Sequence, residues 1–170
     1  MSMRADIDVT ALRDELAKLA SVVAETPSGE AVFDAAADAA CKLIGHKLFT
    51  VMAFDADAME VQRLYSDNPG AYPTGGRKKK RDTAWGRQVL EEDKPYIGYS
   101  ADDIRTHFND HEVIIGLGLE SVLNMPIRSG GRTLGTMNLL HERDYYGADD
   151  LKIASLIAGL LVAPLLTWDG

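Results

Sequence analysis

The sequence has a single cysteine, Cys41, so no disulfide can form within one chain. Acidic residues outnumber basic ones, and the formal net charge of −8 argues against general binding to nucleic-acid phosphates. The longest apolar stretch, residues 153–166, is interrupted by Ser155, Gly159 and Pro164 and is shorter than the ~20 residues that cross a membrane. These absences exclude a disulfide scaffold and argue against nucleic-acid and membrane partners.

Motifs that would indicate catalysis or nucleotide binding are also missing. There is no GxGxxG after an expected strand, no GxxxxGK[ST], and no nucleophile-elbow context around Ser121 or Ser129. The N-terminal residues include Asp6, Asp8 and Asp14, where a secretory signal would be apolar. A lone thiol is compatible with a reducing cytoplasm. We therefore expect a cytoplasmic protein that is not an enzyme and holds no cofactor.

The length and composition fit one globular unit. A chain of 170 residues suits one domain, and its apolar fraction of 46% is typical of a folded protein. No internal repeat or linker divides it. We expect a single domain over residues 1–170, with a core at about 28–168 and an N-terminal helix at about 9–24 that packs with the C-terminal helix.

Hydrophobic periodicity predicts the order of helices and strands. Helices are expected at residues 9–24, 28–45 (with Ser28 as N-cap), 83–91, 101–118 (as one or two) and from 148 onward. Strands are expected at residues 47–55, 58–66, 94–99, 121–128 and 133–141. Residues 47–55 are apolar on both faces and should be covered on both. Residues 58–66 are more polar, which predicts an edge strand, and the Pro- and Gly-rich residues 67–82 are expected to form a loop.

The last third of the chain carries the most specific pattern. Residues 134–139 read Leu-Gly-Thr-Met-Asn-Leu, and Tyr146 and Asp150 follow. Gly135 would allow close packing on its strand, Tyr146 would close the entry to the last helix, and Asp150 would help to cap that helix.

With the order of elements above, this pattern resembles the GAF domain, a small sensory and ligand-binding module, over roughly residues 9–166. The resemblance implies an α+β fold of the GAF-like, PAS-like type. It would have three layers, α/β/α, around a central twisted, mostly antiparallel sheet of five to six strands. The terminal helices would cover one face of the sheet, and a ligand pocket would lie on the other.

Three GAF subclasses can be compared with these residues. Cyclic-nucleotide-binding members show an Asn-Lys pair, but Asn138 is followed here by Leu139, so the match does not support a cyclic nucleotide. Bilin-binding members attach the chromophore to a cysteine. Cys41 is expected on a buried helix, which argues against a covalent bilin. Members that reduce free methionine-R-sulfoxide use several cysteines, and one cysteine cannot close that cycle.

Aromatic and basic residues surround the expected loop at 67–82. Tyr65, Tyr72 and Trp85 bracket glycines, prolines and the basic run at residues 77–81. In a GAF arrangement this segment would pass over the open sheet face as a lid, where aromatic rings and a cation would hold a small anionic or aromatic ligand. The alternative is that Trp85 is a core residue and that the basic run is a solvated loop. For the basic run alone we favour the solvated loop.

Two histidines lie near this region. Asp103, His107 and His111 would share one face of a continuous helix at a spacing that suits a metal. However, residues 109–110 (Asn-Asp) are typical of a helix start, so we favour a polar helix at the pocket rim and expect no metal. His111 is then expected to line the ligand pocket.

Asn124 and Asn138 lie inside otherwise apolar strands, where a buried amide needs partners. They either bond each other or the backbone, or Asn124 points at a ligand; the first alternative is favoured for Asn138. The predicted ligand-binding residues are Tyr65, Tyr72, Trp85, His107, His111 and Asn124.

The sequence therefore predicts a regulatory, ligand-sensing GAF domain. It would bind an unidentified metabolite between the sheet and residues 67–111 and signal through a dimer or a regulatory protein partner. One alternative is a degenerate GAF domain that serves only in dimerisation or protein interaction. Another is an enzyme that uses His107, His111 or Cys41.

The terminal helices carry more apolar residues than one sheet face needs. The last helix is apolar on most sides, and the first adds a narrow stripe of Leu12, Leu16, Leu19 and Val23. This predicts a homodimer in which the first and last helices of two chains pack together. The alternative is a monomer in which the two helices cover each other.

Overall fold

The computed structural model describes residues 6–27 and 29–168. Its helices are α1 (Val9–Glu25), α2 (Gly29–Leu43), α3 (Ala84–Gly86), the π-helix η1 (Arg87–Glu91), α4 (Ala101–His107), α5 (His111–Gly116), α6 (Ala148–Gly159) and α7 (Val162–Leu166). Its strands are β1 (Leu48–Asp55), β2 (Glu60–Ser66), β3 (Arg77–Lys79), β4 (Tyr96–Gly98), β5 (Ser121–Ser129) and β6 (Arg132–His141). None of the described helices is both long and apolar enough to cross a membrane.

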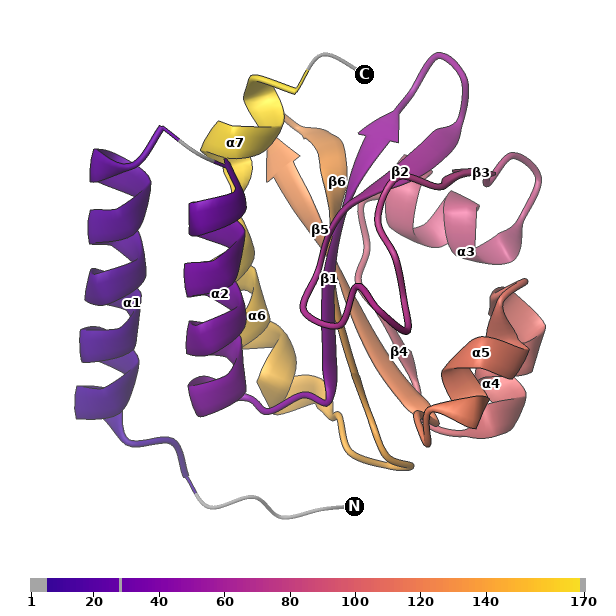
Figure 1. Ribbon diagram of the computed structural model, residues 1–170, viewed down its shortest axis with the longest axis horizontal. Helices are drawn as coiled ribbons and strands as arrows, with labels where there is room; N and C mark the ends of the chain where they lie inside the picture. Colours follow the sequence, from indigo (N-terminus) through magenta and orange to yellow (C-terminus); the bar gives the residue numbers. More distant parts are fainter. Residues whose placement is uncertain (1–5, 28, 169–170) are drawn as a thin grey trace.

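The strands form one antiparallel sheet between two layers of helices, as Figure 1 shows. The strand order is β3-β2-β1-β6-β5-β4. Helices α1, α2 and α6 lie on one side of the sheet, and α3, α4 and α5 lie on the other. The predicted α+β, three-layer fold is confirmed.

One strand lies where the sequence predicted only loop. Residues 77–79 form β3 and pair with β2, so β2 is the second strand from the edge and not the edge itself. The edge prediction was therefore wrong. A β-bulge in β2 lies between Arg63, which pairs with Met52, and Tyr65, which pairs with Val51.

The β5–β6 hairpin fixes the register of the sheet centre. Gly130 and Gly131 have φ of +61° and +76°, as the tight two-residue turn of a hairpin requires. Asn124 then lies opposite Asn138, and Asn138 lies opposite Thr50 of β1. Because side chains alternate along a strand, these three polar residues share the face away from α2 and α6.

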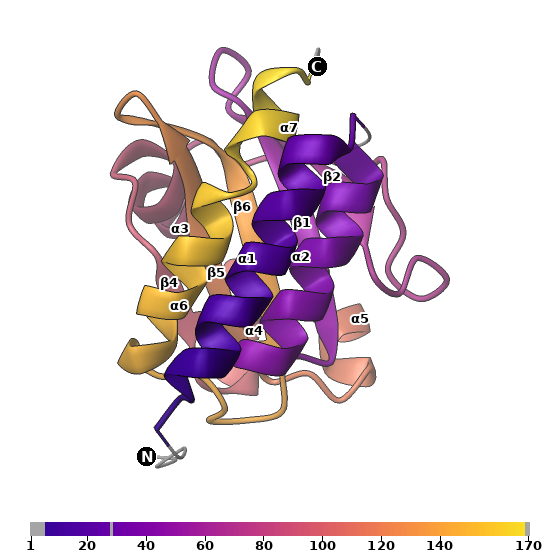
Figure 2. The same cartoon turned by 90° about the vertical axis from the view of Figure 1, so that its left-hand side faces the viewer.

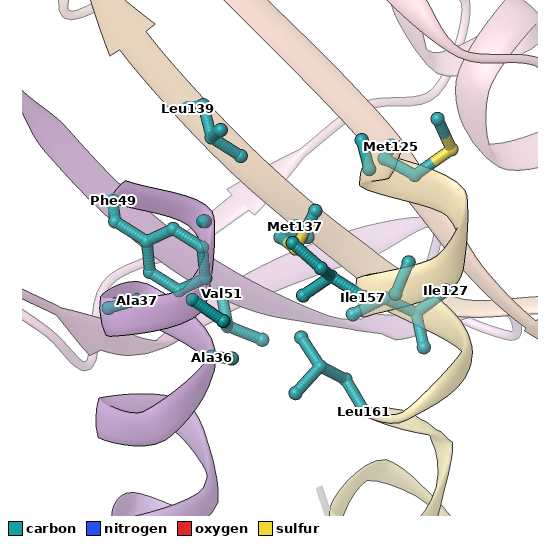
Figure 3. Packing of buried hydrophobic residues seen from close by; sticks show 14 of the residues in the cluster. Ala36, Ala37, Phe49, Val51, Met125, Ile127, Met137, Leu139, Ile157 and Leu161 are labelled. Atoms are coloured by element: carbon teal, nitrogen blue, oxygen red, sulfur yellow. The ribbon is translucent and has the colours of Figure 1, made fainter. Parts of the chain in front are cut away.

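The opposite face of the sheet carries the main core, seen in Figure 3. Phe49 and Val51 of β1 meet Ile157 and Leu161 of the last helical segment, and all four are fully buried. Helix α2 presents small residues to the sheet, which lets it pack closely. The predicted stripe of α2 is buried as expected: Val32, Ala36, Ala39, Ala40 and Leu43.

Helix α1 forms an additional outer layer (Figures 1 and 2). The Thr10 backbone N–H donates to Asp8 Oδ1 at 2.9 Å and caps its N-terminus. The main packing partner of α1 is α2, which in turn contacts α6, whereas the sequence analysis expected α1 to pack with the last helix. The predicted N-cap of α2, Ser28, lies outside the described residues.

The sequence pattern at the C-terminal end has the predicted roles. The Tyr146 hydroxyl donates to the Gly45 carbonyl oxygen at 3.0 Å, and the Gly147 N–H donates to Asp150 Oδ2 at 2.9 Å at the start of α6. Gly135 allows β6 to lie close to β1 and to α7, because an added Cβ would be 2.1 Å from the Met52 carbonyl oxygen and 2.9 Å from Leu165 Cδ1. These contacts hold the last helix against one face of the sheet, and α3–α5 cover the opposite face.

Candidate functional site

A cavity of about 30 Å³ lies on the sheet face opposite α2 and α6. Thr50 and Asn138 belong to its floor, on the two central strands. Tyr72, from the loop between β2 and β3, and Phe108 and Ile114, from the α4–α5 segment, cover it. A space of this size holds a few water molecules or a group of similar size.

A hydrogen-bonded ladder of buried polar side chains crosses the floor. The Trp85 indole N–H donates to Asn124 Oδ1 at 2.9 Å, and Asn124 Nδ2 donates to Asn138 Oδ1 at 2.7 Å. Asn138 Nδ2 then donates to Thr50 Oγ1 at 3.1 Å. The two asparagines bond each other, as one of the sequence interpretations required, and both also line the cavity.

The carboxylate of Asp110 joins the segments that cover the cavity. Asp110 Oδ2 accepts hydrogen bonds from the Tyr72 hydroxyl and, at 2.6 Å, from Lys78 Nζ, and it lies 3.6 Å from a guanidinium nitrogen of Arg63. The Arg63 guanidinium also stacks 3.6 Å from the centre of the Tyr72 ring. Burial by itself raises the pKa of Asp110, but the hydrogen bonds from Lys78 and Tyr72 outweigh it and hold that pKa below its ordinary value.

This shift predicts an acid-sensitive contribution to stability. A carboxyl whose pKa is lowered by folding stabilises the protein above its unfolded pKa of about 3.9 and loses that contribution as the pH falls through its folded pKa. We expect Asp110→Asn to lower the free energy of unfolding at neutral pH, with a deficit that shrinks below about pH 4. Urea denaturation at several pH values measures it, and a deficit independent of pH would contradict the assignment.

Successive side chains of the basic run at residues 77–81 face water and the cavity in turn. Lys79 is exposed, whereas Lys78 is half-buried and Lys80 is only 7% exposed. Alternation along β3 sends Lys78 and Lys80 to the same side. The Lys80 backbone is held at both ends, since its N–H donates to the Met59 carbonyl at 2.9 Å and its carbonyl accepts from Thr83 Oγ1 at 2.8 Å.

The Lys80 ammonium lies in the cavity wall without an anionic partner. Nζ is 5.0 Å from the centre of the Trp85 ring and 5.9 Å from that of Phe108. Within residues 6–27 and 29–168, no carboxylate or other acceptor forms an ion pair or hydrogen bond with it; Asp110 is already engaged by Lys78 and Tyr72. Burial and the positive charges of Lys78 and Arg63 lower the pKa of Lys80 below its ordinary value, against the smaller effect of the negative charge of Asp110.

One buried donor of the cavity has no hydrogen-bond partner among the described residues. Arg63 is 9% exposed, and one of its terminal nitrogens donates to the Pro73 carbonyl at 2.7 Å. Its Nε is buried and has no hydrogen-bond partner among the described residues. Buried polar groups are nearly always paired in native proteins, so the unpaired Arg63 Nε marks the wall of the cavity that Lys80 also lines.

Comparison with known proteins identifies the family that has this architecture. A family model described as GAF domain matches residues 27–163. The chain belongs to the GAF domain family. No match is found among curated protein sequences. GAF domains often serve as sensory and regulatory modules, and the structural neighbours of this one include domains of a sensor kinase and a chemotaxis protein.

Several solved structures share the fold at low identity. The GAF domain of a phosphoenolpyruvate-protein phosphotransferase from Coxiella burnetii is 17% identical with a TM-score of 0.75, over 92% of this chain and 94% of that one. Free methionine-R-sulfoxide reductase from Neisseria meningitidis, in complex with its substrate, is 16% identical with a TM-score of 0.69, over 97% and 95%. The GAF domain of a Bacillus halodurans sensor histidine kinase is 16% identical with a TM-score of 0.61, over 78% and 92%.

In this GAF domain the six predicted ligand-binding residues do not come together. Tyr72 and Asn124 line the cavity, and Trp85 stands behind Asn124. His107 packs against the Tyr96 ring at 4.9 Å, and His111 begins α5; neither lines the cavity. No group of three potential metal ligands occurs in the part of the chain that the structure describes.

Tyr65 lies on the opposite face of the sheet. Its hydroxyl donates to Asp34 Oδ1 at 2.6 Å, and its ring packs near Phe33 and Phe49 of the main core. The β-bulge in β2 is the cause: Arg63 pairs with Met52 on the cavity face, whereas Tyr65, two residues later, pairs with Val51 on the helix face.

Four charged residues of the site are absent from the predicted ligand-binding set. Arg63, Lys78, Lys80 and Asp110 all line the cavity. The basic run was favoured as a solvated loop, and for Lys80 that interpretation was wrong because β3 turns it inward. The run is basic throughout, so no alternation of apolar and polar residues marks Lys78 and Lys80 in the sequence.

Cys41 also differs from its prediction. It lies on α2, as expected, but on the exposed side of that helix and not buried. The inward side of α2 is taken by alanines and Leu43, so the thiol faces away from the sheet. Cys41 is therefore on the helix layer, and the cavity is on the other face of the sheet.

Proposed function

We propose that this chain is a regulatory, small-molecule-sensing GAF domain whose ligand binds in the cavity between the sheet and the segment at residues 67–111. The observation that carries the proposal is Lys80, a buried ammonium with no anionic partner in the described residues. A buried, uncompensated charge destabilises a fold. An anionic ligand would neutralise this charge and would explain why a lysine occupies a buried position, which packing alone does not.

The cover of the cavity supports the proposal because it is separate from the main core on the other face of the sheet. The loop from Asp67 to Gly76 is exposed except for Tyr72. Tyr72 and Lys78 are joined to the α4–α5 segment through one carboxylate oxygen of Asp110. Arg63 also holds this loop, through its stack on Tyr72 and its bond to the Pro73 carbonyl, while the main core lies on the far face of the sheet.

A screen of metabolites by thermal shift, with native mass spectrometry of the freshly purified protein, tests the proposal. We expect at least one compound to raise the melting temperature of the wild type and of Lys79→Met, but not of Lys80→Met. Lys79 is the matched control because it is the exposed neighbour of Lys80 in the same basic run. If no compound changes the melting temperature and no mass is retained, the sensing proposal fails.

The small size of the cavity favours a second candidate, a GAF domain that acts only in dimerisation or protein interaction. The polar ladder on the floor is satisfied internally, and about 30 Å³ is far below the roughly 300–1,000 Å³ of drug-sized pockets. The two candidates differ in the effect of Lys80→Met: it abolishes sensing, but it leaves an interaction module unchanged.

For signal output we propose a homodimer through the terminal helices, in a cytoplasmic protein without catalytic activity. Val9, Leu156 and Leu166 on α1, α6 and α7 remain 75%, 49% and 58% exposed in the single chain. Exposed leucines on one side of a molecule favour association.

Leu156→Glu is expected to convert a dimer into a monomer, because it places a charge in the proposed interface. Val113→Glu is the matched control, since Val113 is equally exposed, at 48%, but lies on α5 in the other helix layer. Light scattering at micromolar concentration measures the mass. A wild-type monomer, or a dimer that Val113→Glu alone disrupts, would place the interface elsewhere or remove it.

A further inference from the structure

We infer that the ligand of this cavity is a compact oxoanion, of the phosphate or small-carboxylate type, held between the Lys80 ammonium and the Arg63 guanidinium. This inference rests on the proposed function and names the chemical class of its ligand. It follows from the charges, the unsatisfied donors and the size of the cavity.

The charges around the cavity do not balance. Arg63, Lys78 and Lys80 are basic, and Asp110 is the one acidic residue among the described residues that line it. The wall therefore has an excess of two positive charges, in a chain whose net charge is −8. Because the surplus of the chain is acidic, this local excess of base is not a feature of its general composition. A low-dielectric site of this kind selects an anion.

The donors of this wall favour a ligand with acceptor oxygens. The ammonium of Lys80 has three N–H donors, and Arg63 Nε adds one that is buried and unpaired. An oxoanion supplies several acceptor oxygens together with the missing negative charge, and charge-assisted bonds of this type are about twice as strong as neutral ones. A neutral amide or alcohol would satisfy the donors but leave the charge uncompensated.

The size and lining of the cavity limit the anion to a small one. About 30 Å³ accommodates a group of a few non-hydrogen atoms while the cover is closed. The rest of the wall includes the apolar side chains of Ile114, Val122 and Leu140, which offer no polar contacts to a sugar or a base. A nucleotide would need a much larger space.

Asp110 competes with an incoming anion for the basic side chains of the cavity wall. Its Oδ2 accepts from Tyr72 and Lys78 and faces Arg63, so a carboxylate oxygen of the protein already takes the donors that an incoming anion would seek. Lys80 is the cation of the wall that Asp110 leaves unpaired. An anion that enters at Lys80 competes with Asp110 for Arg63 and Lys78 and thereby loosens the cover.

Trp85 provides a direct measure of binding, because Lys80 Nζ lies 5.0 Å from its ring. The chain has two tryptophans, so Trp168→Phe leaves Trp85 as the single emitter. In this background the protein is titrated with sodium phosphate, sodium acetate and the neutral isostere acetamide, with chloride used to keep the ionic strength constant. The same titrations are made with Lys80→Met, Lys80→Arg, Lys79→Met and Asp110→Asn.

We expect a saturable change in Trp85 fluorescence with phosphate or acetate and none with acetamide. The anion that binds more tightly shows whether the ligand is of the phosphate or the carboxylate type. Lys80→Met should weaken binding roughly tenfold or more, and Lys79→Met by less than about twofold. Lys80→Arg keeps the charge and should retain binding. Asp110→Asn should tighten it roughly fivefold, because a competitor is removed.

Absence of a Lys80-dependent response to both anions, in a protein whose melting curve shows that it is folded, overturns the inference. If a neutral metabolite then binds in the thermal-shift screen, the oxoanion class is wrong and the sensing proposal stands. If no compound binds in either experiment, both fail. Loss of binding in both Lys80→Met and Lys80→Arg, with both variants folded, would also overturn the inference, because charge at this position would not be what holds the anion.

Discussion

Replacing Gly135 by alanine is expected to lower the free energy of unfolding by about 3 kcal/mol or more. A Cβ at this position would lie 2.1 Å from the Met52 carbonyl oxygen and 2.9 Å from Leu165 Cδ1. The side chain of Leu165 can adjust, but the carbonyl belongs to β1, which pairs with β6 at the centre of the sheet. Relief therefore requires the two central strands to separate, and urea denaturation measures the loss.

Gly159→Ala is the control for this substitution. Nothing lies within 4 Å of the position that its Cβ would take, and its φ is not positive. Alanine there should be neutral or stabilise α6 by about 0.5–1 kcal/mol. Equal urea midpoints for Gly135→Ala and wild type would show that the contact between β6 and β1 at Gly135 is looser than the structure has it.

Asn138→Leu is expected to have the next largest effect, a loss of about 2–3 kcal/mol. Asn138 is the central member of the ladder, since it accepts from Asn124 Nδ2 and donates to Thr50 Oγ1. Leucine of similar size leaves the Asn124 amide buried without its acceptor. The cost is then the desolvation of an unpaired donor, which exceeds the net value of the bond that is lost.

A double-mutant cycle with Thr50→Val isolates this ladder. Valine removes the Thr50 hydroxyl while keeping the shape of the side chain. In the Asn138→Leu background, Thr50→Val should cost less than it does in the wild type, because its hydrogen-bond partner is already absent. Strictly additive effects would mean that the two side chains are not energetically coupled.

Much of the fold could be predicted from the sequence because local signals and burial agree along most of the chain. The stripe on α2, the strand at residues 47–55 with two apolar faces, and the hairpin closed by Gly130 and Gly131 are all present. β3 could not be found in this way. It has three residues, all basic, in a segment rich in glycine and proline, so neither apolar alternation nor propensity marks it.

The site was predicted less well for a related reason. Tyr72 and Asn124 were found because an aromatic residue in a lid and an amide in an apolar strand are both conspicuous. Arg63 and Lys80 were not, since basic residues are ordinarily exposed. Their burial depends on tertiary features, namely the bulge in β2 and the pairing of β3 with β2, that no local pattern of the sequence records.

The central claim is that Lys80 is present for a ligand and not for the fold, and the free energy of unfolding of Lys80→Met tests it most directly. Without ligand at neutral pH, the variant should be more stable than wild type by about 1 kcal/mol or more, because methionine fills the space without a buried charge. Added phosphate or acetate should stabilise the wild type and leave the variant unchanged. Lys79→Met serves as the reference and should lie within about 0.5 kcal/mol of wild type. A Lys80→Met protein that is less stable than wild type in the absence of anion would show that the lysine supports the fold and would contradict the account.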